Sequence, residues 1–196
     1  MSDKYILTEF LELSNDASLL TESERQKVNE GEEFILAGVM QRAEAENGNG
    51  RIYPMDILAR EVENYKKLVR DSRSLGELDH PDSPVIELKN ASHMVTYIEM
   101  RGKDVIGKIR VLDTPAGRTA KELLKGGVKL GISSRGLGST KNQNGKTIVQ
   151  EDFQLVCFDL VSEPSTTGAF MLKEGIQPNL FTKADRINRI LNSIIK

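Results

Sequence analysis

The distribution of apolar positions along the chain predicts more strands than helices. Apolar residues gather in short runs, several alternating with polar residues, and turn signals bound them, as is typical of β-strands. The segments 101–104 (RGKD) and 142–145 (NQNG) favour tight turns between neighbouring strands. We therefore expect strands over residues 34–40, 95–98, 105–111, 130–138, 147–150 and 153–161.

Helical spacing occurs in three places. Apolar residues recur three or four positions apart between Ile57 and Val69, as on the buried face of a helix, and Pro54 suits the start of that helix. A shorter helix is expected over residues 115–124, which two glycines follow. A basic amphipathic helix is expected over residues 184–195.

The N-terminal part of the chain differs from the rest. Residues 3–13 mix apolar and acidic side chains and fit either a strand or a helix, whereas residues 14–31 are polar and predict a loop or mobile segment. We expect an N-terminal segment over 1–32 that is mobile or processed, a central domain over 33–175, and a C-terminal segment over 176–196. The predicted architecture of the central domain is α+β, with a mainly antiparallel, barrel-like sheet and flanking helices.

Composition narrows the classes of function. The 196 residues are 38% hydrophobic and 29% charged, which fits a soluble globular protein. The net charge of −2 and the sparse aromatic residues argue against a nucleic-acid partner. No apolar run is long enough for a membrane span and no signal peptide opens the chain, so we expect a cytoplasmic protein without a membrane partner. The single Cys157 fits a reducing compartment.

A pair of serines, Ser133 and Ser134, lies in the strand-like segment GISSRG. A serine hydroxyl attacks a carbonyl group at neutral pH only when a base takes its proton, and that base is usually a histidine whose ring a third group fixes. Successive residues of a strand point to opposite faces, so only one of the two serines faces a given pocket. The alternative is that both are ordinary strand serines.

The chain offers two histidines as candidates for the base. His80 lies in the loop expected over 76–84, and Pro81 limits its backbone to extended conformations. His93 begins an apolar strand and would be either a structural histidine or the group that orients His80. Asp159 lies in another apolar strand, where a carboxylate is costly unless it is paired, and orienting a histidine would pair it. Strand alternation also allows Asp159 to point to water.

Motifs for metal ions and cofactors are lacking. Two separated histidines and one cysteine give no recognisable set of zinc ligands. The segment Gly136–Gly138 is too short to form a phosphate-binding loop. The sequence therefore predicts neither a metal site nor a bound cofactor.

Several segments, taken in their order along the chain, resemble the prohead core proteases of large tailed bacteriophages. These proteins are serine endopeptidases that share a fold with the herpesvirus assembly protease. The resemblance covers about residues 33–170 and lies in residues 47–54 (NGNGRIYP), 76–81 (GELDHP), 113–117 (DTPAG), 131–136 (GISSRG) and 159–165 (DLVSEPS).

The resemblance implies a herpesvirus-protease-like fold and a set of catalytic residues. It implies that Ser133 is the nucleophile and that His80 is the base. The herpesvirus enzymes use a second histidine as the third member, whereas the comparable strand here offers Asp159. His93 and Glu163 are the alternatives for that position.

The resemblance also implies a function. The chain would be a capsid-maturation protease that cleaves scaffold or core proteins and the major capsid protein inside the immature prohead, in the host cytoplasm. Cleavage would follow a glutamate that has an aliphatic residue two positions before it. We expect a homo-oligomer. The alternative is a non-enzymatic structural or scaffold protein of phage assembly on the same fold, because a fold does not fix a function.

The implied specificity would allow the enzyme to cut its own chain. Three segments fit it, namely Leu7-Thr8-Glu9, Leu20-Thr21-Glu22 and Leu172-Lys173-Glu174. The Leu20 site is favoured because it lies in the stretch expected to be mobile, while a paired strand over 3–13 would protect the Leu7 site. Leu-x-Glu is also a common triplet, so chance matches are the alternative.

Overall fold

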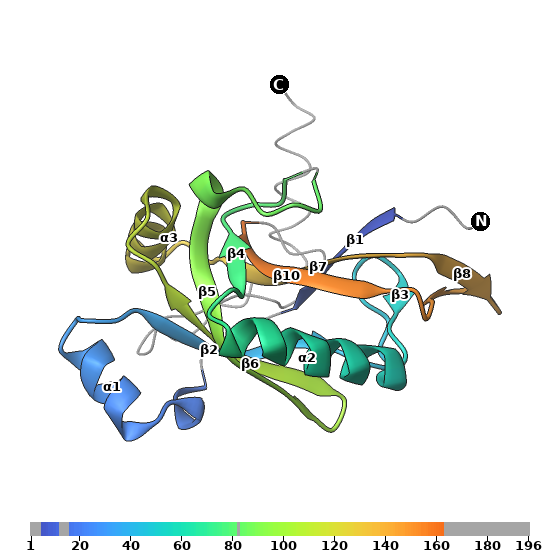
Figure 1. Cartoon of the computed structure of the whole chain (residues 1–196), viewed down its shortest axis with the longest axis horizontal. Coiled ribbons are helices and arrows are strands. Elements are labelled where there is room, and N and C mark those ends of the chain that lie inside the picture. The colour runs from blue at the N-terminus through green and yellow to red at the C-terminus, as the bar shows by residue number, and fades with distance from the viewer. Residues whose placement is uncertain (1–4, 12–15, 82, 163–196) are drawn as a thin grey trace, which may run out of the picture.

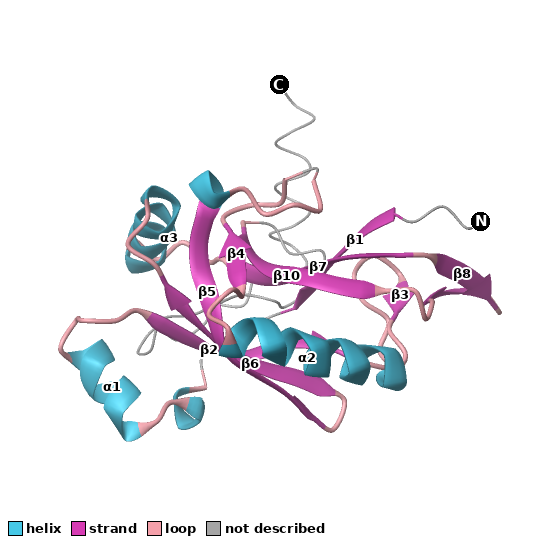
Figure 2. Ribbon diagram, in the orientation of Figure 1, coloured by secondary structure: helices cyan, strands magenta, loops and turns pink. Residues whose placement is uncertain are grey.

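The computed structural model describes residues 5–11, 16–81 and 83–162. Strands fill the centre of the molecule and the helices lie at its margins (Figure 1 and Figure 2). The helices are α1 (Glu22–Asn29), α2 (Met55–Arg70) and α3 (Pro115–Lys125), with short 3-10 helices η1 (Ala17–Leu19) and η2 (Leu88–Asn90). The strands are β1 (Tyr5–Leu11), β2 (Ile35–Arg42), β3 (Arg51–Ile52), β4 (Leu75–Glu77), β5 (Ala91–Arg101), β6 (Asp104–Val111), β7 (Gly131–Gly138), β8 (Thr140–Gln143), β9 (Lys146–Val149) and β10 (Gln154–Val161).

The described strands form three open sheets, with the orders β1-β7-β10, β2-β6-β5-β4 and β3-β9-β8. Every strand pair is antiparallel except β3 with β9, which confirms the α+β prediction with a mainly antiparallel sheet. The prediction of a barrel was wrong for these residues. Leu78, the residue after β4, forms a single bridge with Leu160 of β10, and the chain then turns away, so the sheets β1-β7-β10 and β2-β6-β5-β4 do not close into one barrel.

The two predicted helices inside the central domain are confirmed. Helix α2 crosses the front of the sheets in Figure 1 and buries the predicted apolar face, and Tyr65 meets the ring of Phe158 on β10 edge-to-face with centroids 5.6 Å apart. Helix α3 begins after Thr114, whose Oγ1 accepts the N–H of Gly117 at 3.0 Å. That cap satisfies one of the donors that a helix start leaves unpaired.

The prediction of a loop over 14–31 was wrong, because residues 22–29 form α1. Thr21 and Glu24 make a capping box, in which the Thr21 Oγ1 accepts the Glu24 N–H at 3.3 Å and the Glu24 carboxylate accepts the Thr21 N–H at 2.8 Å. The same carboxylate pairs with Lys108 on β6 at 2.8 Å. A polar helix is therefore held by its cap and by this ion pair.

Residues 5–11 adopt the strand alternative and pair with β7 as β1. In the described part of the chain, no helix combines the length and apolar character that a bilayer crossing requires. The division into 1–32, 33–175 and 176–196 stays a prediction, and the helix expected over 184–195 lies outside the described residues.

The loop that follows β4 and carries His80, called here the histidine loop, leaves the second sheet in a defined direction. Residues 75–77, part of which was expected to be a loop, form β4 at the edge of the second sheet. The next two amides are fixed, because the Leu78 N–H donates to the Asn90 carbonyl at 3.1 Å and the Asp79 N–H donates to the Leu160 carbonyl at 2.7 Å. Asp79 has a left-handed φ of 68°, a conformation that aspartate tolerates better than most residues. The chain is thus anchored to β10 immediately before His80.

The approach of β4 to its neighbours requires a glycine. A Cβ atom added to Gly76 would lie 2.1 Å from the carbonyl oxygen of Phe158 and 2.3 Å from the Nε2 atom of His93. Both neighbours are buried, so neither can move aside easily. The missing side chain lets β4 bring the histidine loop close to β10.

We expect Gly76→Ala to lower the free energy of unfolding by about 1–3 kcal/mol, because the added methyl group overlaps backbone and buried imidazole atoms. Urea unfolding would measure the change. Gly126→Ala is the matched control, since Gly126 ends α3 with a φ of −73°, and there we expect a change below about 1 kcal/mol. Equal effects in the two variants would contradict the steric argument.

Candidate active site

The pairing of β7 with β10 places Ser133 directly opposite Asp159. Directly opposed residues of an antiparallel pair share one face of the sheet, so the two side chains lie on the same side. Ser133 is 1% exposed and Asp159 is 0% exposed. Two polar groups from distant parts of the sequence are therefore brought together in a buried position by strand register.

His80 lies between these two side chains. Its Nδ1 is 2.8 Å from the Asp159 Oδ2, and its Nε2 is 2.6 Å from the Ser133 Oγ. An ionised carboxylate accepts hydrogen bonds and cannot donate them, so Nδ1 carries the proton and Nε2 is left to accept the hydroxyl proton of Ser133. The His80 side chain is 25% exposed, so it lies at the border between the buried carboxylate and the surface.

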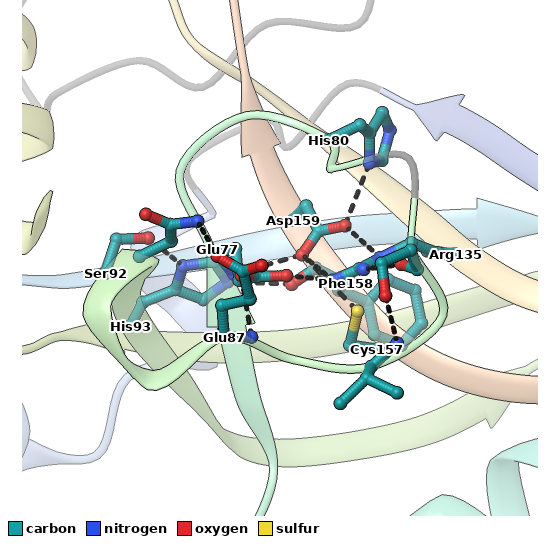
Figure 3. Close-up of polar contacts among 12 residues, drawn as sticks. Glu77, His80, Glu87, Ser92, His93, Arg135, Cys157, Phe158 and Asp159 are labelled. Carbon is teal, nitrogen blue, oxygen red and sulfur yellow. Dashed lines mark hydrogen bonds and ion pairs between the residues drawn. The ribbon is translucent and has the colours of Figure 1, made fainter.

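Asp159 is held by donors from several directions (Figure 3). Its Oδ1 accepts the backbone N–H of Glu77 at 3.0 Å and faces the Cys157 Sγ at 3.3 Å. Arg135 donates to both oxygens, from Nε at 2.8 Å and from Nη2 at 3.2 Å. Burial alone would raise the pKa of Asp159, but the His80 hydrogen bond and the Arg135 charge outweigh burial and lower the pKa. Asp159 is therefore ionised at neutral pH.

Two residues that contact Asp159, Arg135 and Glu77, were not expected from the sequence to do so. Arg135 lies two residues after Ser133 on β7, and its side chain is completely buried. Glu77 is also completely buried, and its Oε2 accepts from the Arg135 Nη2 at 2.5 Å. A charged residue inside an apolar strand was the available signal for Arg135, since such a charge requires a buried partner.

His93 lies on β5 and does not contact His80. Its Nε2 is 2.9 Å from the Phe158 carbonyl oxygen, which can only accept, so Nε2 donates and Nδ1 accepts from the Ser92 hydroxyl at 2.8 Å. Burial lowers the pKa of His93 to about 4, so the ring is neutral at neutral pH. His93 therefore braces β5 against β10. Glu163, the other alternative for the third member, lies outside the described residues.

The Cys157 thiol beside Asp159 is neutral. Burial is the main reason that the pKa of this thiol is well above its ordinary value, and the Asp159 charge raises it further.

The site does not have the composition of a metal centre. Within residues 5–11, 16–81 and 83–162, no cluster of three or more histidine, cysteine or acidic side chains has the arrangement of a metal site. The arrangement that is present suits proton transfer from a hydroxyl to an imidazole.

Known proteins are similar to this chain both in sequence and in structure. The chain is 34% identical over 158 residues to the prohead core protein protease of Enterobacteria phage T4, which covers 78% of this chain and 74% of that protein. A solved structure of the bacteriophage T4 capsid assembly protease matches with a TM-score of 0.68 and 27% identity, over 81% of this chain and 98% of the other. Residues 8–179 match the family described as prohead core protein serine protease. With most of its length matched and a geometry suited to serine chemistry, the chain belongs to the family of prohead core protein serine proteases.

Proposed function

We propose that this protein is the maturation endopeptidase of a phage prohead, with Ser133 as nucleophile, His80 as general base and Asp159 as the group that orients His80. The observation that carries the proposal is the unbroken chain of hydrogen bonds from the Ser133 hydroxyl through both nitrogens of His80 to the Asp159 carboxylate. A nucleophile, a base and an orienting group in contact are the minimum for acyl transfer by a serine.

The reaction follows from these contacts. The Ser133 Oγ attacks the carbonyl carbon of the scissile peptide, and its proton passes to the His80 Nε2. His80 then gives this proton to the leaving amine, the C–N bond breaks, and an acyl-enzyme ester remains. Water attacks the ester after His80 takes one of its protons, and the acid product leaves as Ser133 regains its hydrogen. Asp159 stays ionised and stabilises the imidazolium in each half of the cycle.

The developing oxyanion needs donors besides these three residues. The Arg135 guanidinium is directed toward Asp159 and Glu77, and the backbone amides around Arg135 lie in β7 between the paired strands β1 and β10, so neither is free to act as such a donor. The backbone amides that follow Pro164 remain as candidates for these donors, and they lie outside the described residues. A herpesvirus-protease-like arrangement of the whole fold also stays a prediction.

The substrates are proposed from the relatives. Those proteins are described as a prohead core protein protease and a capsid assembly protease, so we propose that core and capsid proteins of a phage prohead are the substrates here. The site of action would be the assembling capsid in the host cytoplasm. Cleavage after glutamate and a homo-oligomeric state remain predictions from the resemblance. A purely structural protein is disfavoured, because it would have no need for a serine in contact with an oriented histidine.

Self-cleavage is part of the proposal, and we propose a different first site from the one that the sequence favoured. Leu20 is buried and α1 begins at Glu22, so the site between them is not in a mobile stretch as expected. Strand β1 instead runs along the strand of the nucleophile, with Glu9 opposite Ser134 and Phe10 opposite Ser133. The sequence led us to expect that pairing would protect this site. Because proteases commonly bind substrates as added strands, we propose instead that β1 takes the place of a substrate strand and that the Glu9–Phe10 bond is cut. The Leu172 site lies outside the described residues.

We expect a fluorophosphonate probe to modify Ser133, because its Oγ lies 2.6 Å from the His80 Nε2. Ser133→Ala and His80→Ala should each abolish labelling and lower peptide cleavage by about 10⁶-fold, since nucleophile and base act as a unit. Mass spectrometry of the labelled peptide would locate the adduct. Ser134→Ala is the matched control and should retain labelling. Retention of full activity in Ser133→Ala would rule out the proposed nucleophile.

We expect Asp159→Asn to reduce kcat by about 10²–10⁴-fold, because an amide can hold His80 in the wrong tautomer and carries no charge. The same change leaves Arg135 without one of its carboxylate partners, so thermal unfolding should be measured alongside turnover. Cys157→Ser is the control for a neighbour that touches Asp159 without touching His80. Wild-type turnover in Asp159→Asn would remove Asp159 from the site.

We expect the purified chain, incubated at high concentration, to release a fragment that ends at Glu9. The reason is the position of the Glu9–Phe10 bond beside Ser133 in the paired strands. Intact mass measurement over time would show the product, and Ser133→Ala should remain uncut. Glu9→Gln is the control for specificity after glutamate and should block this cut alone. A first product that ends at Glu22, or an uncut chain in an active preparation, would contradict this assignment.

A further inference from the structure

The Arg135 guanidinium connects three parts of the site. It donates to both oxygens of Asp159 on β10, to the Glu77 carboxylate on β4, and from Nη1 to the carbonyl oxygen of Ser83 in the histidine loop. Its planar set of donors matches the bidentate geometry of a carboxylate. The Asp159 carboxylate therefore has little freedom to rotate beneath His80.

Glu77 is fixed as firmly as Arg135. One carboxylate oxygen accepts from Arg135, and the other accepts the backbone N–H of Glu87 at 3.0 Å. The Glu77 backbone N–H donates to Asp159, so this one residue supports the orienting carboxylate directly and also through Arg135. Figure 3 shows Glu77 on the opposite side of this network from His80.

The net charge of the buried groups affects the stability of protonated His80. Asp159 and Arg135 alone would form a neutral pair, and a neutral pair stabilises an imidazolium poorly. Glu77 adds a second negative charge, so the buried set carries a net charge of −1 while His80 is neutral. When His80 takes the Ser133 proton, the net charge becomes zero, which is the cheaper state in a low-dielectric site.

We propose that Glu77 and Arg135 are positioning residues, in which Arg135 fixes the Asp159 carboxylate and Glu77 supplies the extra negative charge that keeps Asp159 effective beside the Arg135 cation. This inference rests on the proposed serine protease function. Neither residue touches the reacting atoms, and both act through Asp159 and His80.

Within the described part of the chain, the other titratable groups named here do not supply this charge. Burial raises the pKa of Tyr65 and of Cys157 well above their ordinary values, so both are neutral. His93 is neutral as well. Asp79 next to His80 and Lys89 of η2 are exposed, where water screens their charges.

The test measures how fast a fluorophosphonate modifies Ser133 as a function of pH. Loss of the Glu77 charge should make the imidazolium less stable, so the acid limb of the rate profile should move to lower pH in Glu77→Gln, by about one unit. The double variant Glu77→Gln with Arg135→Met restores a net charge of −1. Its rate should fall because Asp159 is no longer fixed, but its acid limb should lie within about 0.3 unit of the wild-type position.

Glu61→Gln is the matched control. Glu61 is a buried carboxylate on α2 whose Oε2 accepts the Leu155 N–H at 2.9 Å, so the change removes a buried charge outside the catalytic cluster. We expect its acid limb to coincide with that of the wild type even if its thermal stability falls. Because the position of the limb does not depend on the amount of folded enzyme, a purely structural role of Glu77 would leave it unmoved.

The outcomes separate failure of the proposed protease function from failure of the inference about Glu77 and Arg135. A wild-type chain that is not modified at Ser133 overturns the proposed function and, with it, this inference. A reactive wild type with an unshifted limb in Glu77→Gln overturns only the inference. If Glu77→Gln does not fold, the double variant decides. A folded double variant whose acid limb is displaced from the wild-type position overturns the inference. Loss of the fold in both variants also overturns it, because Glu77 and Arg135 would then have a structural role only.

Discussion

The buried charge of Asp159 is the constraint on which the rest of the site depends. An ionised carboxylate without exposure to water is destabilising by several kcal/mol unless donors surround it. The donors here come from β4, from β7 and from the histidine loop, while Asp159 itself is on β10. The four segments must therefore meet at one place for the charge to be tolerated, and that meeting sets the position of His80.

The hydrogen bonds that stabilise the buried Asp159 also fix its carboxylate next to His80. Donors that favour the charged form lower the pKa of Asp159, so its contribution to stability is present above the unfolded value of about 3.9 and is lost as pH falls through the lower folded value. In the neutral range the carboxylate stays charged and keeps His80 in one tautomer. Stability and orientation thus have the same source.

The burial of Ser133 connects the site to the N-terminal strand. Ser133 is 1% exposed, so a long peptide would reach its hydroxyl only after a neighbouring segment moves. Strand β1 pairs with residues 132–138 of β7, which include this serine. The proposed cut within β1 would shorten the strand that lies next to Ser133.

The sequence by itself determined the local elements and the candidate chemistry. Runs of apolar residues with turn signals gave the long strands, helical spacing gave α2 and α3, and the scarcity of histidines reduced the candidate base to His80 or His93. These features depend on backbone hydrogen bonding and burial within a short window of residues. The capping box of Thr21 and Glu24 was also local, but the polar composition of that segment concealed α1.

Only the tertiary structure decided how the sheets end, which serine meets His80, and how the buried charges are paired. The sheets remain open because β4 leaves β10 after one bridge. Ser133 rather than Ser134 touches His80 because the β7–β10 register puts Ser133 opposite Asp159. Gly76 lets β4 approach β10 closely, and Glu77 of β4 pairs with Arg135 of β7 beside this approach. Strand register and close approach depend on contacts between residues far apart in sequence, and no local pattern of side chains encodes them.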